Sequence, residues 1–179
     1  MQYGTRVICR YCEILIIVSI LVSSSGCGYH FLKRGGGPLR DFKTIAISYF
    51  INKTYEPGID RIFTDALVNE FVESREFTLT TEDKADVVMK GVVRSFEEKT
   101  ISYNRNDRVL EYRASVALDF SVEERTTGKI LWRDKNITHN EEYRVNTDIA
   151  VTEFNKDEAI KRLAAELAEK IHDNLLEGF

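Results

Sequence analysis

The sequence is poor in the residues from which metal and catalytic sites are usually built. It has 3 histidines and 3 cysteines among 179 residues, and the histidines (His30, His139 and His172) do not show the spacing of a zinc-binding motif. No Gly-x-Ser-x-Gly turn, which would present a nucleophilic serine, follows residue 27. Neighbouring acids such as Glu97 and Glu98 point to opposite faces of an extended strand, unlike the facing carboxylates of a glycosidase. We therefore expect no metal, no cofactor and no enzyme active site, with His172 an ordinary helix residue.

Positive charge is not in excess either. The chain has 25 Lys and Arg against 29 Asp and Glu, which gives a formal net charge of -4. Binding of nucleic acid usually needs a broad cationic field, so nucleic acid is not an expected partner, and any anionic ligand must meet a local patch. A composition of 43% hydrophobic and 30% charged residues is typical of one folded domain.

Long apolar runs are also absent, apart from residues 14–22. At about 1.5 Å per residue in a helix, this run is too short to cross a hydrocarbon core of about 30 Å. Arg6 and Arg10 precede it and the small residues 23–26 follow it, which is the order of a secretory signal peptide. We therefore expect residues 1–26 to be a signal peptide that is removed.

A cysteine, Cys27, stands directly after this segment. With Ser25 and Gly26 before it, the cysteine resembles the lipobox of bacterial lipoproteins, although Ser24 stands where leucine is usual. The resemblance implies a diacylglycerol on the sulfur and acyl chains, palmitate among them, that hold the protein firmly in a bilayer. The alternative is an ordinary free thiol after a plain signal peptide. Gly28, in place of the aspartate that retains such lipoproteins in the inner membrane of enteric-type bacteria, favours the periplasmic face of the outer membrane.

The mature chain is expected to consist of a tether and one domain. Cys27 would be its only cysteine, because the two earlier ones lie in the signal peptide, so no disulfide can form within it. Residues 27–42 contain three consecutive glycines and a proline, which favours a flexible tether between the membrane and the domain. The domain itself is predicted to span residues 43–179.

Hydrophobic periodicity predicts the elements of this domain. Alternating patterns rich in β-formers predict strands at residues 43–50, 77–81, 86–98, 109–123 and 129–138, the last resuming to 145. Apolar residues spaced three and four apart predict a helix from Pro57-Gly58 to Ser74. A final helix is predicted from Asn155, which would cap it with Glu158, to just before Gly178. Gly91, inside a predicted strand, indicates a bulge or a close backbone approach.

These elements predict an α+β fold. A strand, a helix and a second strand imply a parallel pair, while the clean alternation at residues 109–123 places one sheet face in the core and the other in water. The expected architecture is a two-layer α/β sandwich in the order β-α-β-β-β-β-α. Two helices pack on one face of a mixed sheet of about four to five strands, and the opposite face is polar.

One polar turn, residues 103–108, is a candidate binding element. It carries Arg105 and Arg108 and is flanked by Arg94 and Arg113. Guanidinium groups bind phosphate through paired hydrogen bonds, so these four arginines are candidates for contact with an anionic glycolipid. The alternative is that the turn is polar only because turns face water.

Several segments together resemble the lipopolysaccharide-assembly lipoproteins of the LptE type from Gram-negative outer membranes. They are CGYHF (27–31), KTIAISYFINKTYEPGID (43–60), ADVVMKGVVRSF (85–96), RTTGKILWRDKNITHNEEY (125–143) and AIKRLAAELAEKIHDNL (159–175). The resemblance implies a non-enzymatic, lipid-anchored protein that sits inside or against a large β-barrel of the LptD type. There it would help lipopolysaccharide reach the outer leaflet.

Some of these segments also look like other envelope lipoproteins. A regulator of a cell-wall synthase and a subunit of a secretion pore are therefore alternatives. A regulator would have to reach through the peptidoglycan, and a tether of roughly 15 residues spans at most about 50 Å, which is short for that task.

Overall fold

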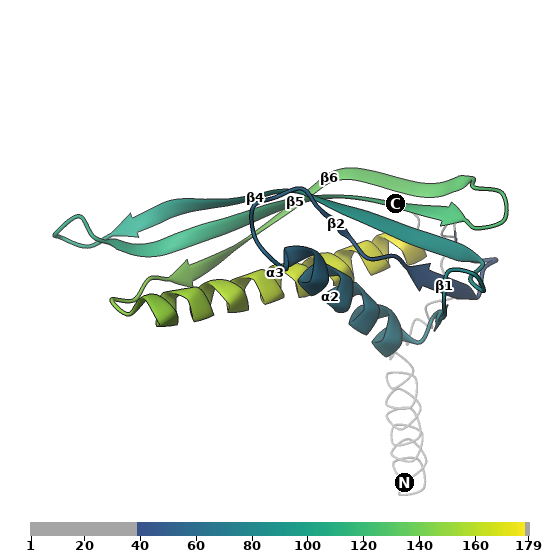
Figure 1. Cartoon of the computed structure of the whole chain (residues 1–179), viewed down its shortest axis with the longest axis horizontal. Coiled ribbons are helices and arrows are strands. Elements are labelled where there is room, and N and C mark those ends of the chain that lie inside the picture. The colour runs from purple at the N-terminus through teal and green to yellow at the C-terminus, as the bar shows by residue number, and fades with distance from the viewer. Residues whose placement is uncertain (1–38, 178–179) are drawn as a thin grey trace, which may run out of the picture. The chain divides into compact units, whose positions relative to one another are not determined.

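The computed structural model describes residues 39–177 (Figure 1), so the predicted signal peptide, Cys27 and His30 lie outside the described residues. The elements, in chain order, are β1 (Thr44–Ile47), β2 (Ile51–Asn52), α2 (Ile59–Ser74), β3 (Thr78–Leu79), β4 (Val87–Tyr103), β5 (Val109–Glu124), β6 (Ile130–Arg144) and α3 (Ile149–Glu177). Leu39 is buried, and Phe42, at the end of the predicted tether, packs against the core.

The strands form one mixed sheet in the order β3-β1-β4-β5-β6, with the short β2 also paired to β4. β1 is parallel to both β3 and β4, whereas β4, β5 and β6 are antiparallel neighbours. The predicted parallel pair around the first helix is therefore confirmed, as is the α+β order. β2 is a short strand that the sequence pattern did not indicate.

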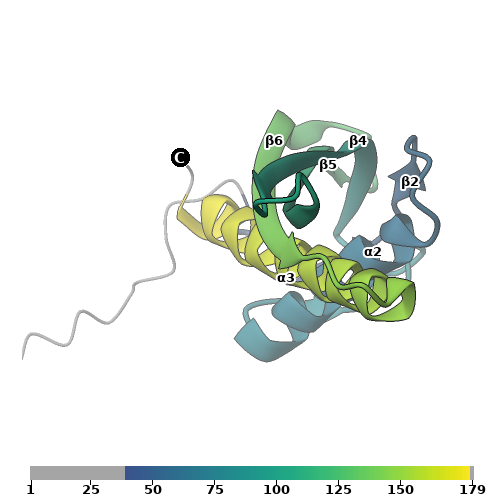
Figure 2. The same cartoon turned by 90° about the vertical axis from the view of Figure 1, so that its left-hand side faces the viewer.

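The helices α2 and α3 form a second layer on one face of the sheet (Figures 1 and 2). The predicted stripes point into that layer, because the residues that match the period are buried: Ile59, Phe63, Leu67 and Phe71 in α2, and Ile160, Leu163, Ala164, Leu167, Ala168, Ile171 and Leu175 in α3. From β5 the core receives Ala114, Val116, Leu118, Phe120 and Val122. Neither helix of the described domain has the apolar length that a membrane crossing requires.

The start of α3 corrects one prediction, because the helix begins at Ile149 rather than at Asn155. Asp148 caps it, since its Oδ1 accepts the N–H of Ala150 at 2.9 Å. Asn155 lies inside the helix, where its amide donates to the carbonyl of Arg144 at 2.9 Å. The prediction was wrong because the first turns of α3 leave their apolar side chains exposed, so the period of the core does not extend to them.

Asp86 joins the start of β1 to the start of β4. Its Oδ2 accepts the N–H groups of Lys43 at 3.1 Å and Thr44 at 2.9 Å, and its own N–H donates to Thr44 Oγ1 at 2.8 Å. The hydrogen bond from Lys43, followed by those with Thr44, holds the pKa of Asp86 below its usual range. The ionised carboxylate therefore stabilises the parallel part of the sheet.

Asp86→Asn should lower the free energy of unfolding by about 1 kcal/mol at pH 7, because a neutral amide is a weaker acceptor than a carboxylate. Because the pKa of Asp86 is lower in the folded protein, its contribution to the free energy of unfolding is complete above the unfolded-state pKa of 3.8. That contribution is lost as the pH falls through the folded-state pKa. Urea unfolding at pH 7, 5 and 3 should show the same gap between wild type and variant at pH 7 and pH 5 and a smaller gap at pH 3. Asp83→Asn, in the adjacent exposed turn, is the control, and a gap that stays constant with pH would contradict the assignment.

Candidate functional site

The sheet face opposite the helices carries paired charges along β4, β5 and β6. Lys90 bonds Glu123 at 2.7 Å, Arg94 bonds Asp119 at 2.6 Å and Arg113 bonds Glu142 at 2.7 Å. Each pair joins two neighbouring strands, and most of these side chains are exposed, so each is expected to add little to stability. The polar face predicted from the alternation is present, and many of its charges neutralise one another.

At the centre of this face, Asp119 holds both neighbouring strands where their regular pairing is interrupted. Its Oδ2 accepts a hydrogen bond from Arg94 at a bulge in β4, and its Oδ1 accepts the backbone N–H of Asn136 in β6 at 2.9 Å. Asn136 has φ 57°. Burial raises the pKa of Asp119, but these hydrogen bonds and the nearby cations outweigh it, so the pKa lies below its usual range. Because bulges bend strands, Asp119 fixes the local curvature of the sheet.

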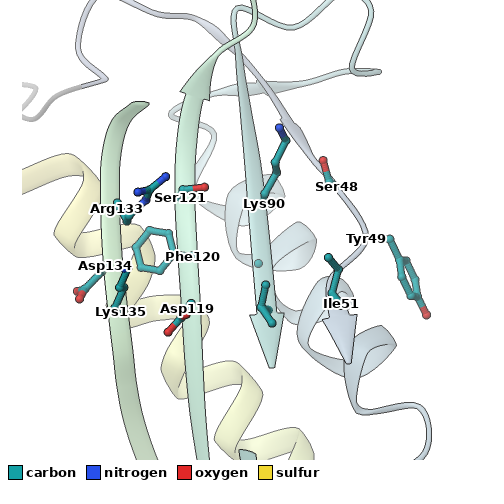
Figure 3. Close-up of a pocket in the computed structure, with 12 residues that line it drawn as sticks. Ser48, Tyr49, Ile51, Lys90, Asp119, Phe120, Ser121, Arg133, Asp134 and Lys135 are labelled. Atoms are coloured by element: carbon teal, nitrogen blue, oxygen red, sulfur yellow. The ribbon is translucent and has the colours of Figure 1, made fainter. Parts of the chain in front are cut away.

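Beside Asp119, the polar face contains a hollow of about 380 Å³ that extends from β2 to β6 (Figure 3). Three of its residues face one another across the strands: Lys90 in β4 is opposite Ser121 in β5, which is opposite Arg133 in β6. The residues next to them along β4 and β5 point to the other face and are buried in the core: Met89, Phe120 and Val122. This alternation places the hollow on the face away from the helices. Its lining includes the apolar residues Ile51, Val92 and Phe120, the cations Lys90, Arg133 and Lys135, and the acids Asp119 and Asp134.

Two of these cations form no direct ion pair in the described domain, although the charge of Arg133 acts on Glu123 and that of Lys135 on Asp119. Lys90 is paired with Glu123, whereas Arg133 and Lys135 form no ion pair with any residue between 39 and 177. Figure 3 shows Arg133 extending toward β5, while the carboxylate of Asp134 is directed away on the other side of β6. The hollow therefore combines an apolar lining with two cations available to a ligand.

The four predicted arginines fall into two groups. Arg94 and Arg113 lie on the polar sheet face, each already bonded to a carboxylate. Arg105 and Arg108 lie in the exposed turn between β4 and β5, the hairpin tip, and form no ion pair within the described domain. Sequence reasoning missed Arg133 and Lys135. The only indication in the sequence was their place in the RTTGKILWRDK segment. The irregular pairing of β6 breaks the alternation that would have shown that both side chains lie on the same face of the sheet.

The backbone of the hairpin tip is fixed by one side chain. Asn104 Oδ1 accepts the N–H groups of Asn106 at 2.8 Å and Arg108 at 3.1 Å, and Asp107 has φ 57°. Asparagine and aspartate tolerate such turns because they bond to nearby backbone groups. The tip therefore presents Arg105 and Arg108 from an ordered turn.

Exposed apolar side chains gather at the same end of the domain. Tyr103 and Leu110 flank the tip, and Ile149 and Phe154 lie exposed in the first turns of α3. The N–H of Val145 donates to the carbonyl of Leu110 at 2.8 Å, which brings the segment before α3 alongside the hairpin (Figure 1). Cationic and apolar side chains side by side suit an anionic amphiphile.

On the helix side of the sheet, Lys156 of α3 forms a closed cluster of charges. Its ammonium lies 2.6 Å from Glu56 and 3.3 Å from Glu98, and 5.4 Å from the ring centre of Phe96. Glu98 also accepts a hydrogen bond from the Tyr143 hydroxyl, and burial raises the pKa of that hydroxyl. Burial lowers the pKa of Lys156, but Glu56 and Glu98 outweigh it, so the pKa lies above its usual range. The cluster, one cation between two carboxylates, connects α3 to β4 and to the segment after β2.

The histidines of the described domain do not form a site. His172 is buried between α2 and α3, with its ring edge-on to Phe71 at 5.1 Å between centres. His139 bonds Glu166 at the surface. Among residues 39–177, no group of three or more His, Cys, Asp or Glu side chains could hold a metal ion.

Comparisons with known proteins agree with this fold. A family model, described as LptE, lipopolysaccharide-assembly, matches residues 42–175. The rare lipoprotein B of Shewanella oneidensis has a TM-score of 0.50 at 14% identity, covering 74% of this chain and 92% of that one. Lipoprotein B of Nitrosomonas europaea has a TM-score of 0.50 at 13% identity, covering 75% and 83%. At these identities the two structures show a shared fold alone, and no curated protein sequence matches. The extent of the family match shows that the chain belongs to the LptE family, outer-membrane lipoproteins of lipopolysaccharide assembly.

Proposed function

We propose that the protein is a non-enzymatic partner of a large outer-membrane β-barrel of the LptD type, with which it delivers lipopolysaccharide to the outer leaflet. The family match over residues 42–175 carries the proposal. The polar sheet face supports it, because the lumen of a large barrel is polar and a surface of exposed, mutually paired charges can be accommodated there. The helix face, which contributes the core, would not be the contacting surface.

The proposal includes a lipid anchor at Cys27. The order of an arginine-flanked apolar run, small residues and cysteine supports acylation at this position. Residues 27–42 would then tether the domain to the inner leaflet of the outer membrane, at its periplasmic face. Acyl chains contribute about 0.8 kcal/mol per buried methylene, so two or three chains form an anchor that does not readily dissociate.

Isolation of the native protein in mild detergent tests the partner and the anchor in one sample. We expect a large β-barrel to co-purify with it, and mass spectrometry to show a mature chain that begins at an acylated Cys27. Depletion of the protein should leave newly made lipopolysaccharide in the periplasm. If the folded protein is recovered without a barrel and depletion leaves lipopolysaccharide export unchanged, the proposal is wrong.

Arg105 and Arg108 are the proposed contacts with lipopolysaccharide, because their guanidinium groups are exposed beside apolar side chains. Arg94 and Arg113 remain candidates, but they would have to exchange Asp119 and Glu142 for the ligand. Charge-assisted hydrogen bonds from arginine to phosphate are among the stronger polar contacts in proteins. The tip should therefore contribute measurably to affinity.

Arg105→Glu combined with Arg108→Glu should weaken lipopolysaccharide binding by the purified protein about tenfold, which corresponds to about 1.4 kcal/mol. The matched control is Arg61→Glu combined with Lys170→Glu, which makes the same change in net charge at exposed positions of the two helices. We expect the control to bind within about twofold of wild type, less than 0.5 kcal/mol. Equal weakening by both double variants would mean that net charge, and not the tip, governs binding.

A further inference from the structure

We propose that the hollow between β2 and β6 is a second ligand site, which takes a phosphate group and the adjoining alkyl segment of a phosphorylated glycolipid. The inference deepens the proposed function and rests on it for the class of ligand, since lipopolysaccharide is itself a phosphorylated amphiphile. The hollow lies apart from the hairpin tip. Tyr103 lies eleven positions after Val92 in β4, which corresponds to roughly 35 Å along a strand.

The apolar part of the hollow accounts for the alkyl segment. Val92 is half-buried on this face, and Ile51 at the edge of the hollow is 57% exposed, while Phe120 also contributes to the lining although its side chain packs in the core. A large aliphatic side chain left in water beside a concave surface gains when an apolar ligand covers it. The volume of about 380 Å³ lies within the range of about 300–1,000 Å³ for ligand pockets, enough for a headgroup phosphate with a short apolar segment but not for a whole glycolipid.

The charges around the hollow account for the phosphate. Both oxygens of Asp119 are already engaged, by Arg94 and by the backbone of Asn136. Glu123 is paired with Lys90, and the carboxylate of Asp134, the remaining acid of the lining, is directed away from the hollow (Figure 3). Arg133 and Lys135 then remain as the cations without an ion pair, within the described domain, at this site.

The two serine hydroxyl groups in the lining of the hollow already donate hydrogen bonds to carboxylates. Ser48 Oγ donates to Glu82 at 2.5 Å, and Ser121 Oγ donates to Glu123 at 3.4 Å. Their protons are committed, so they do not compete with the cations for an anion. A guanidinium group at one edge can bind phosphate through two parallel hydrogen bonds, with the Lys135 ammonium as a second point charge.

The test uses the full mature chain in phosphatidylcholine nanodiscs and three probes: hexyl phosphate, inorganic phosphate and hexanol. The only tryptophan of the chain, Trp132, precedes Arg133, so its fluorescence reports on binding at β6. We expect a saturable change with hexyl phosphate, at least fivefold tighter than with inorganic phosphate and absent with hexanol. Arg133→Glu combined with Lys135→Glu should weaken hexyl phosphate binding about tenfold.

The variant of the hairpin tip, Arg105→Glu with Arg108→Glu, is the control and should bind hexyl phosphate as wild type does. Should the hollow variant fail to fold, Arg133→Gln with Lys135→Gln removes the charges without adding acids. Equal binding of hexanol would identify a purely apolar surface, and equal binding of inorganic phosphate a simple anion site; either result overturns the inference. Unchanged binding in the hollow variant also overturns it, while leaving the proposed function standing if the barrel still co-purifies.

Discussion

Gly91→Ala should lower the free energy of unfolding by about 3 kcal/mol, at the upper end of the range for overpacked cores. A Cβ at this position would overlap Cζ and both Cε atoms at the far edge of the Phe50 ring, closer than the 3.0 Å below which real Cβ atoms are essentially never found. The ring cannot move aside cheaply, because Phe50 is 2% exposed and its backbone N–H is held by Thr64 of α2 at 3.1 Å. Urea unfolding of the purified domain measures the effect.

A double-mutant cycle separates this clash from other effects of alanine. Phe50→Leu removes the far end of the ring, and should by itself cost about 1–2 kcal/mol as a large-to-small core change. In that background Gly91→Ala should be close to neutral, since alanine is otherwise preferred to glycine inside a strand by about 0.5–1 kcal/mol. The two changes should therefore be strongly non-additive. If Gly91→Ala costs the same with and without the phenylalanine ring, the close approach is not the reason for the glycine.

The same position shows how far a sequence can predict this fold. Gly91 indicated a bulge or a close backbone approach, and in the structure it is a side chain, the ring of Phe50 from the loop between β1 and β2, that lies against it. The irregularities of β4 lie instead at Arg94 and, nearer the hairpin tip, between Thr100 and Tyr103. A glycine reports that a Cβ is not tolerated, but not which distant residue occupies the space, because that depends on the register of β1 and β2 against β4.

Elements with one-sided burial were predicted well. The stripe of α2 and the alternation of β5 persist over many residues, so the period of 3.6 or 2 identifies them without tertiary information. The first turns of α3 were missed because their apolar residues, such as Ile149 and Phe154, are exposed and follow no core period. β2 has only two residues, too few for any period to be recognised.

The two candidate sites, the hairpin tip and the hollow, also differ in whether a sequence pattern can find them. Arg105 and Arg108 are close in sequence and share one turn, so a sequence pattern can find them. The hollow takes residues from β2, β4, β5 and β6, and its cations in β6 lie next to an irregular stretch where Asn136 has φ 57°. A shift of one residue exchanges the two faces of a strand, so which side Arg133 faces could not be decided before the register was known.

Lys156→Met should lower the free energy of unfolding by about 2 kcal/mol, because it leaves the carboxylates of Glu56 and Glu98 close together without a cation. Removing one partner of a fully buried pair costs about 3–5 kcal/mol. The side chains here are 14% exposed for Lys156, 17% for Glu56 and 32% for Glu98, so solvent offsets part of that cost. Methionine keeps most of the length and the apolar character of the stem, so the change removes the charge and with it the contact of the ammonium with the Phe96 ring.

The control lies on the same helix. Lys161 pairs with Glu158 at 2.7 Å, but the two side chains are 59% and 39% exposed, so Lys161→Met should leave stability unchanged within error. The pKa of Lys156 is raised from 10.5 in the folded protein. Its contribution to the free energy of unfolding is therefore complete below pH 10.5 and is lost only as the pH rises through the folded-state pKa. Urea unfolding should thus show the same deficit for Lys156→Met at pH 6 and pH 9. Equal effects of the two lysine variants would show that the cluster joins α3 to the sheet no more strongly than a surface pair does.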